Sequence, residues 1–212
     1  MKAKFHLEAI NKLADTVWES GDRLLSAFAV GGDDSAQLRK ILDAGNFPVA
    51  ATICDMGSGF GALSRASAEY RKDLTVISLN ISEEQLKYCP EPRVLADYAE
   101  TGFKPESMDG LVFAFSIGHA EDQNKVFQEA FRILSPGGKI VISDLAGSPD
   151  GLWDLAYEPF NTFDGIPLRH GFSLLERKGY DAVLRESFAV PAYIMKHLFG
   201  GYRPVIWVYE KC

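Results

Sequence analysis

The sequence predicts a single doubly wound α/β domain, in which a mostly parallel sheet carries helices on both faces. Short apolar runs alternate with amphipathic stretches through the middle of the chain, which is the strand–helix–strand order of parallel sheets. The 212 residues are enough for one domain with a substantial core, and a content of 47% hydrophobic and 24% charged residues is typical of globular proteins. We expect residues 1–45 to form a helical cap, residues 46–145 the core, and residues 146–212 an excursion followed by the last strands.

The cap is predicted from helical spacing. Residues 5 to 29 carry apolar side chains at positions that fall on one face of a helix. A further helix is expected through Leu38, Ile41 and Leu42, with Asp34 or Ser35 as its cap, and it ends before Pro48.

The core is predicted to contain five strands and three helices. Ser135–Gly138 is expected to stop the third helix and to turn tightly into the fifth strand. The strands are Ala50–Cys54, Leu74–Leu79, Val94–Ala96, Leu111–Phe115 and Lys139–Ser143, and the helices are Ala62–Tyr70, Glu83–Cys89 and Gln123–Leu134.

The pattern is looser after Asp144. Residues 147 to 170 are rich in Gly, Pro and aromatic residues, and we expect them to form a surface excursion near the ligand site. The aromatic residues Trp153, Tyr157, Phe160 and Phe163 have the spacing of a helix core face, and they also suit the wall of a binding pocket. Helices are expected at Ser173–Lys178 and Tyr193–Leu198, and an antiparallel edge from strands Val183–Val190 and Val205–Glu210.

Composition narrows the class of partner. The net charge of −7 disfavours nucleic acid, because binding to a phosphate backbone depends on Lys and Arg. No apolar run reaches eighteen residues, the N-terminus lacks a signal-peptide core, and the three cysteines have no C-x-x-C spacing. We therefore expect a cytoplasmic protein with no nucleic-acid partner, no metal site and no membrane span, and a homodimer stays open.

A glycine-rich turn carries the strongest chemical signal. An apolar run ends in Asp55, and Gly57, Gly59 and Gly61 follow at alternate positions. Glycines in a turn between strand and helix let the backbone approach a ligand where a Cβ would clash. Open α/β sheets bind ligands at the carboxyl ends of their strands, so Asp55 is expected at the ligand edge. Gly57, Gly59 and Ala62 also fit the dinucleotide pattern, which keeps a nicotinamide cofactor open on this segment alone.

The other strand ends are polar as well. Asn80 follows the first glycine of the turn at the distance of a ribose-binding residue, although a nicotinamide enzyme would more often have Asp or Glu there. Ser82 and Gln85 have capping-box spacing. Asp97 ends the third strand, where it can accept from an adenine amino group, and Phe115–Asp122 forms a polar loop at the same rim.

This ordered set resembles the class I S-adenosylmethionine-dependent methyltransferases, which have a Rossmann-like fold. The sequence Asp55-x-Gly57-x-Gly59-x-Gly61 is similar to their first motif. Further motifs are matched by Val76–Gln85, Ala96–Asp97 and Leu134–Lys139. Gly31-Gly32 and Gly118–Asp122 are similar to the branch with phosphoethanolamine, glycine-type amine, tocopherol and sterol methyltransferases.

The resemblance implies transfer of a methyl group from S-adenosylmethionine to N or O of a small-molecule acceptor, with S-adenosylhomocysteine as product. His119, in the loop after the fourth strand, is the candidate catalytic residue, because an unperturbed imidazole titrates near neutrality. The implied cofactor contacts are Asp55, Gly57, Gly59, Gly61, Asn80, Ile81, Gln85, Asp97, Tyr98, Phe115 and Ser116.

Two alternatives stay open. C-methylation of a lipid, quinone or isoprenoid is disfavoured, because the C-methylating terpenoid and sterol branches carry a carboxylate near the position of Phe115 or Ser116. A catalytically silent cofactor-binding or partner-binding module is the alternative from another class. The motifs of base-amine and cytosine-C5 methyltransferases are absent from the sequence.

Overall fold

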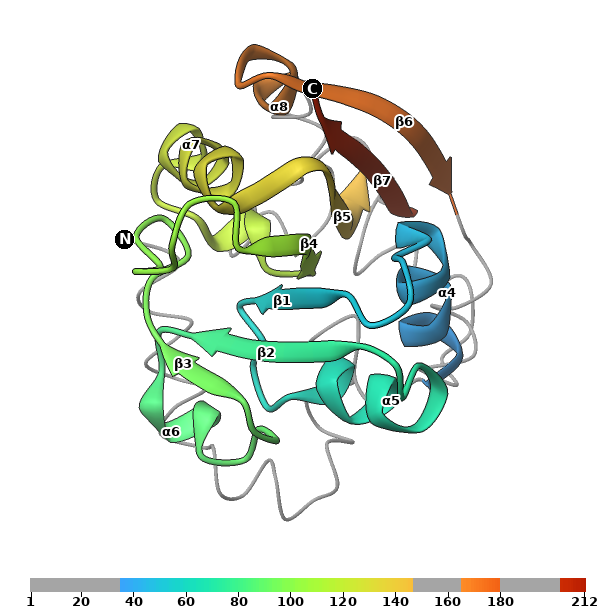
Figure 1. Ribbon diagram of the computed structural model, residues 1–212, viewed down its shortest axis with the longest axis vertical. Helices are drawn as coiled ribbons and strands as arrows, with labels where there is room; N and C mark the ends of the chain where they lie inside the picture. The colour runs from blue at the N-terminus through green and yellow to red at the C-terminus, as the bar shows by residue number, and fades with distance from the viewer. Residues whose placement is uncertain (1–34, 147–164, 180–202) are drawn as a thin grey trace.

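The computed structural model describes residues 35–146, 165–179 and 203–212, which form a sheet with helices packed on it (Figure 1). The expected helix within residues 5–29, the aromatic residues between Trp153 and Phe163, the strand Val183–Val190 and the helix Tyr193–Leu198 all lie outside the described residues. The helices are α4 (Ser35–Gly45), α5 (Ala62–Tyr70), α6 (Glu83–Leu86), the 3₁₀ turn η1 (Ile117–His119), α7 (Gln123–Ile133) and α8 (Ile166–Arg169). The strands are β1 (Thr52–Met56), β2 (Thr75–Asn80), β3 (Arg93–Leu95), β4 (Met108–Ala114), β5 (Leu134–Ala146), β6 (Phe172–Gly179) and β7 (Arg203–Lys211).

The seven strands form one sheet in the order β3-β2-β1-β4-β5-β7-β6. The first five are parallel to their neighbours, and β7 is antiparallel to both β5 and β6. The predicted doubly wound sheet with an antiparallel C-terminal edge is therefore confirmed. On one side of the sheet the chain runs outward from β1 to β3. On the other side it runs from β4 to β5, continues to the edge strand β6 and returns with β7 between β5 and β6. β1 and β4 are therefore neighbours at the point where the winding reverses.

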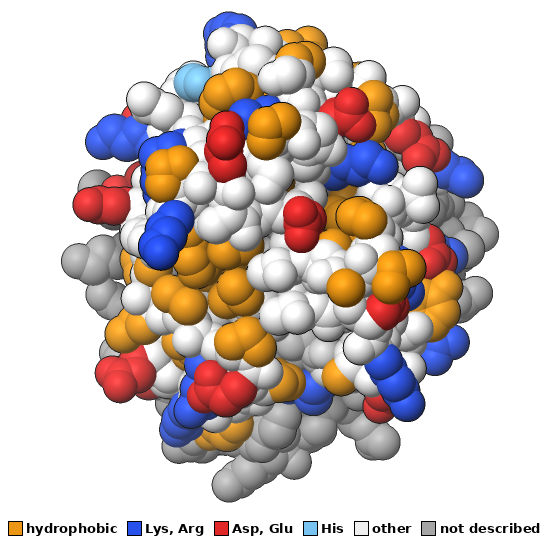
Figure 2. Space-filling view, in the orientation of Figure 1, with side chains coloured by type: hydrophobic (Ala, Val, Ile, Leu, Met, Phe, Trp, Pro, Cys, Tyr) orange, Lys and Arg blue, Asp and Glu red, His pale blue; other side chains and the backbone are white. Residues whose placement is uncertain are grey.

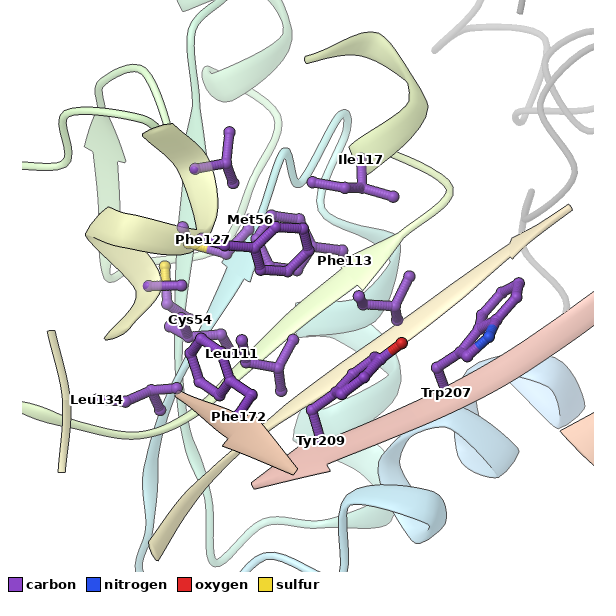
Figure 3. Packing of buried hydrophobic residues seen from close by; sticks show 14 of the residues in the cluster. Cys54, Met56, Leu111, Phe113, Ile117, Phe127, Leu134, Phe172, Trp207 and Tyr209 are labelled. Carbon is purple, nitrogen blue, oxygen red and sulfur yellow. The ribbon is translucent and has the colours of Figure 1, made fainter. Parts of the chain in front are cut away.

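Both faces of the sheet are buried, which explains why its strands are apolar runs rather than alternating ones. Along β4, Leu111 and Phe113 belong to the core that also contains α7, and Val112 belongs to the opposite core, which contains α4 and α5. The same alternation along β7 sends Trp207 and Tyr209 toward the α7 side (Figure 3). The two cores thus cover both faces of the sheet.

Most of the predicted elements occur, with shifted ends. The helix Ala62–Tyr70 has the expected bounds, and the helix expected through Leu38, Ile41 and Leu42 is α4, which ends before Pro48. β1 begins at Thr52 rather than Ala50, because Ala50 has a left-handed φ of +63°. α6 has four residues, since the chain leaves the helix before Cys89 and Pro90. β5 begins immediately after α7. In place of the expected tight turn, the pairing of β5 with β4 changes register near the start of β5.

One prediction was wrong in kind. Ser173–Lys178 was expected to be helical, but it lies in the edge strand β6, which pairs with β7 along its length. Most of its side chains are exposed, so it has no apolar alternation that would mark a strand. Pairing with β7 outweighs the helical preference of residues such as Leu and Glu.

The surface carries charges of both signs. Figure 2 shows acidic and basic side chains interspersed over the face that it presents. None of the helices in the described ranges is long and apolar enough to cross a membrane.

Candidate cofactor and acceptor site

The candidate site lies at the carboxyl edge of the sheet, where β1 and β4 are neighbours. Doubly wound sheets bind ligands at such a reversal, because the loops after the two strands diverge to opposite faces and leave a crevice between them. The β1 loop carries Asp55 and the glycines, and the β4 loop carries Phe115, Ser116 and His119. The fold thus brings together the motifs that the sequence separates by 60 residues, as the bond between Ser116 and Met56 shows.

The glycine turn is anchored to the sheet. The backbone amides of Gly57 and Ser58 both donate to the carbonyl of Leu79 in β2, at 2.9 Å. Gly57, Gly59 and Gly61 all have positive φ angles, of +87°, +53° and +81°. The turn then enters α5 at Ala62.

The three glycines have different surroundings. A Cβ on Gly57 would come within 2.8 Å of Cβ of Ser116, and one on Gly61 within 2.9 Å of Cα of Cys89. For Gly59 the nearest atom among the described residues is Oε1 of Gln85, at 3.9 Å. Gly57 and Gly61 are therefore required for packing, and Gly59 is the position where the backbone of the turn is open.

Asp55 is a buried carboxyl at the base of the turn. Its side chain is 2% exposed, and it pairs in register with Ser78 of β2 and Val112 of β4. Burial raises the pKa of Asp55 to about 7, because the low-dielectric surroundings disfavour the charged form. A carboxyl whose pKa is moved to neutrality beside an open backbone is a feature of functional sites.

The β2 end forms a hydrogen-bonded group beside the turn. Asn80 is buried, and its Nδ2 donates to the carbonyl of Gly59 and to Oε1 of Gln85, both at 3.2 Å. Ser82 caps α6 by accepting from the amide of Gln85, as its spacing predicted. Ile81, by contrast, is 55% exposed at the rim.

The β3 end contributes Asp97 and Tyr98. Asp97 is exposed, and its Oδ1 accepts from the amide of Ala99 at 2.7 Å. The ring of Tyr98 packs edge-on against Phe113, and its hydroxyl donates to the carbonyl of Ser116 at 3.4 Å. Burial raises the pKa of Tyr98, and the charges of nearby carboxylates raise it further.

The β4 loop begins with a strained residue. Phe115 has a φ of +56°, which is unfavourable for a side chain with a Cβ, and its amide donates to the carbonyl of Ser143. Ser116 is buried and donates to the carbonyl of Met56 at 2.6 Å. His119 closes the 3₁₀ turn, with its backbone amide bonded to the carbonyl of Ser116.

Some of the predicted site residues are connected to one another across the loops, and others are not. Hydrogen bonds connect Asn80 to Gly59 and Gln85, and Tyr98 to Ser116, while Gly57 leaves no room for a Cβ beside Ser116. Asp97 and His119 lie at the same edge. The hydrogen bond from the amide of Ala99 to Asp97 and the one from the amide of His119 to Ser116 each lie within a single loop.

Two residues of this region were missed by the sequence analysis. Asp144 is completely buried in β5, and its charge contributes to the raised pKa of Tyr98. The signal for it was an acid near the end of an apolar strand, which is also how Asp55 was found. Cys89 is buried against the glycine turn, with its Sγ 3.3 Å from the carbonyl of Gly59. No local pattern marks it, because the contact depends on how the loop after α6 folds back.

Comparison with known proteins agrees with this geometry. Residues 54–142 match the family model described as a methyltransferase domain. The chain is 29% identical over 132 residues to the ubiquinone/menaquinone biosynthesis C-methyltransferase UbiE of Rickettsia prowazekii, a match that covers 55% of this chain and 53% of that protein. It is 32% identical over 110 residues to the sarcosine/dimethylglycine N-methyltransferase of Aphanothece halophytica, which covers 47% of this chain and 39% of that protein.

A solved structure shares the fold over most of the chain. The geranyl diphosphate C-methyltransferase of Streptomyces coelicolor A3(2), in complex with Mg²⁺, geranyl diphosphate and S-adenosyl-L-homocysteine, superimposes with a TM-score of 0.71 at 16% identity. That match covers 84% of this chain and 79% of the other. The two relatives in sequence are covered over no more than about half of their length. The family match over residues 54–142, the motif order and the strand order together support a class I S-adenosylmethionine-dependent methyltransferase domain.

Proposed function

We propose that the chain transfers a methyl group from S-adenosylmethionine to an N or O atom of a small-molecule acceptor. The observation that carries this proposal is the pairing of a buried carboxyl, Asp55, with a turn whose backbone is open at Gly59, at the reversal between β1 and β4. We also expect the enzyme to be cytoplasmic, on the basis of its three cysteines without C-x-x-C spacing, and to have no nucleic-acid partner, on the basis of its net charge of −7. A homodimer is compatible with this proposal.

The residues present fit the cofactor. The carboxylate of Asp55 suits the ammonium group of the methionine part, and the open face at Gly59 lets a ligand approach the backbone. Ile81 offers an exposed apolar side chain for the adenine, and Asp97 an exposed acceptor. When bound, S-adenosylmethionine supplies a methyl group that its sulfonium makes electrophilic.

The acceptor would lie on the β4 side. Phe115 and Ser116 begin the loop that faces the glycine turn, and His119 follows them at the rim. For a hydroxyl acceptor the imidazole of His119 can remove the proton, whereas a neutral amine needs no base. Holding acceptor and cofactor in line while excluding water is then the main contribution of the protein.

C-methylation of a lipid, quinone or isoprenoid is the second candidate, and Asp144 is the observation that favours it. The β4 loop has no carboxylate at Phe115 or Ser116, but Asp144 places a buried one in the neighbouring strand β5. A carboxylate at the acceptor side can stabilise positive charge that develops on an alkene. The C-methyltransferase UbiE among the relatives also supports this candidate. Transfer of a ¹³C-labelled methyl group, followed by NMR of the product, separates carbon from nitrogen and oxygen as the accepting atom.

The first experiment is calorimetric titration with S-adenosylhomocysteine. We expect saturable binding by the wild type, and at least a tenfold loss in Asp55→Ala with the fold retained by circular dichroism. Asp122→Ala is the matched control, because Asp122 is an exposed carboxylate that caps α7. A well-folded wild type that does not bind S-adenosylhomocysteine would refute the proposal. Binding without turnover of any acceptor would favour the silent module.

A further inference from the structure

The carbonyl of Gly59 is held from two sides by side chains that follow β2. Nδ2 of Asn80 donates to this oxygen at 3.2 Å, and Sγ of Cys89 donates to it at 3.3 Å. Asn80 is 6% exposed and Cys89 is 5% exposed, so both donors are buried, while Gly59 itself is half-buried. The most open position of the glycine turn is therefore also one that two buried donors fix.

The amide of Asn80 has one orientation that fits its neighbours. Its Nδ2 faces two carbonyl oxygens, those of Gly59 and of the Gln85 side chain, each at 3.2 Å. Its Oδ1 faces the backbone amide of Ser82, at 3.5 Å. Because carbonyl oxygens only accept, position 80 must supply a donor toward the turn. A carboxylate at this position would instead place negative charge against both oxygens.

We propose that Asn80 is a positioning residue that, together with Cys89, holds the Gly59 carbonyl and so shapes the turn for the amino-acid end of S-adenosylmethionine. This inference rests on the proposed function. A trans peptide is planar and directs its carbonyl and its amide to opposite sides. Fixing the carbonyl of Gly59 toward Asn80 therefore aims the amide of Phe60 away from it and sets the backbone that the ligand meets. The amide of Asn80 is engaged in this task rather than directed at the ribose.

Two ligands separate these roles. S-adenosylhomocysteine contains adenine, ribose and the amino-acid end, and 5′-methylthioadenosine contains the first two without the third. We expect Asn80→Asp to weaken S-adenosylhomocysteine binding at least tenfold at pH 8, and 5′-methylthioadenosine binding less than threefold. Asn46→Asp, an exposed turn residue, is the control for the added charge. Equal losses for both ligands, or tighter binding by Asn80→Asp, would mean that position 80 reads the ribose and would overturn the inference.

Cys89 supplies an independent test that does not change charge. Cys89→Ala removes the donor and should weaken S-adenosylhomocysteine binding about threefold to tenfold. Cys89→Ser keeps a donor and should restore most of that loss, while Cys212→Ser, at an exposed thiol, should have no effect. If Cys89→Ser and Cys89→Ala bind equally, the contact is only packing and the inference fails. Failure of the proposed function is distinct, because then the wild type itself does not bind S-adenosylhomocysteine.

Discussion

The hydroxyl of Ser116 at the end of β4 donates a 2.6 Å hydrogen bond to the carbonyl of Met56 at the end of β1. Both residues are buried, so the bond fixes the spacing of the two strand ends between which the cofactor is proposed to bind. Ser116 also accepts from the hydroxyl of Tyr98 through its own carbonyl. The β1, β3 and β4 ends are thus connected through this one residue.

Ser116→Ala should destabilise the protein by about 1–3 kcal/mol, because the Met56 carbonyl loses its buried donor. It should also weaken S-adenosylhomocysteine binding, since the two strand ends lose their link. Denaturant unfolding and calorimetry measure the two effects. Asp122→Ala serves as the control, because losing the α7 cap costs about 1 kcal/mol at a site outside the glycine turn. If the two variants bind S-adenosylhomocysteine with equal affinity, the Ser116 hydrogen bond does not contribute to cofactor binding.

Asp55→Asn should raise the stability of the protein at alkaline pH. It should also remove the fall in stability that the wild type shows as pH rises from about 4 to 7. The folded-state pKa of about 7 lies above the ordinary carboxyl pKa of 3.8, so the folded protein holds the proton more tightly than the unfolded chain. Stability of the wild type therefore falls as pH rises from about 4 to 7 and is then level, with a total loss on the order of 4 kcal/mol. The variant should be more stable than the wild type at pH 8 and equal to it at pH 4. Parallel pH curves for the two proteins in urea would contradict the assignment.

Cofactor affinity should have the opposite pH dependence. The ionised carboxyl of Asp55 holds an ammonium group better than the neutral acid does, so S-adenosylhomocysteine binding should strengthen as pH rises through about 7. With that pKa, the affinity at pH 6 should be roughly tenfold below that at pH 8. Calorimetry in two buffers of different ionisation enthalpy should detect proton release near pH 7. Asp55→Asn should show neither the slope nor the proton release, and an unchanged slope in this variant would assign the titration to another group.

The fold was predictable because its signals are local to each strand. The buried runs of β1, β2, β4 and β5 are continuous, and capping and glycine signals separate them from the helices. β6 could not be found in this way, since its exposed residues 174–178 have no strand pattern and the pairing with β7 joins segments about thirty residues apart.

The sequence predicted which residues lie at the site, but it did not predict which atoms each of them contacts. The sequence placed Asn80 and Gly59 at one edge, yet only the structure shows the first donating to the carbonyl of the second. It also presented Gly57, Gly59 and Gly61 as equivalent, whereas their neighbours come from the β4 loop, α6 and the turn after α6. Such distinctions depend on segments far along the chain, and spacing within a motif carries no information about them.

Alanine at two glycines of the turn should therefore separate stability from binding. Gly61→Ala places a Cβ 2.9 Å from the backbone of Cys89 at a residue whose φ is also positive, and should cost about 2–5 kcal/mol of stability. Gly59→Ala meets open space among the described residues and should cost only about 1–2 kcal/mol for its positive φ. Its binding of S-adenosylhomocysteine should nevertheless fall at least tenfold. If Gly59→Ala keeps wild-type affinity, the cofactor does not approach the turn at that residue.

Replacing His119 with Gln should leave cofactor binding intact and reduce turnover. The residue lies in the β4 loop at the edge of the site, and its backbone amide is bonded to the carbonyl of Ser116, so Gln can keep the local fold. For a hydroxyl acceptor, loss of a general base should lower kcat by roughly 10²–10⁴-fold and remove the acid limb of the pH–rate profile. For an amine acceptor the loss should be small, because the nucleophile attacks without giving up a proton first. Release of S-adenosylhomocysteine with matched panels of amines and phenols measures this difference. Equal turnover by wild type and variant with every acceptor would exclude His119 as the base.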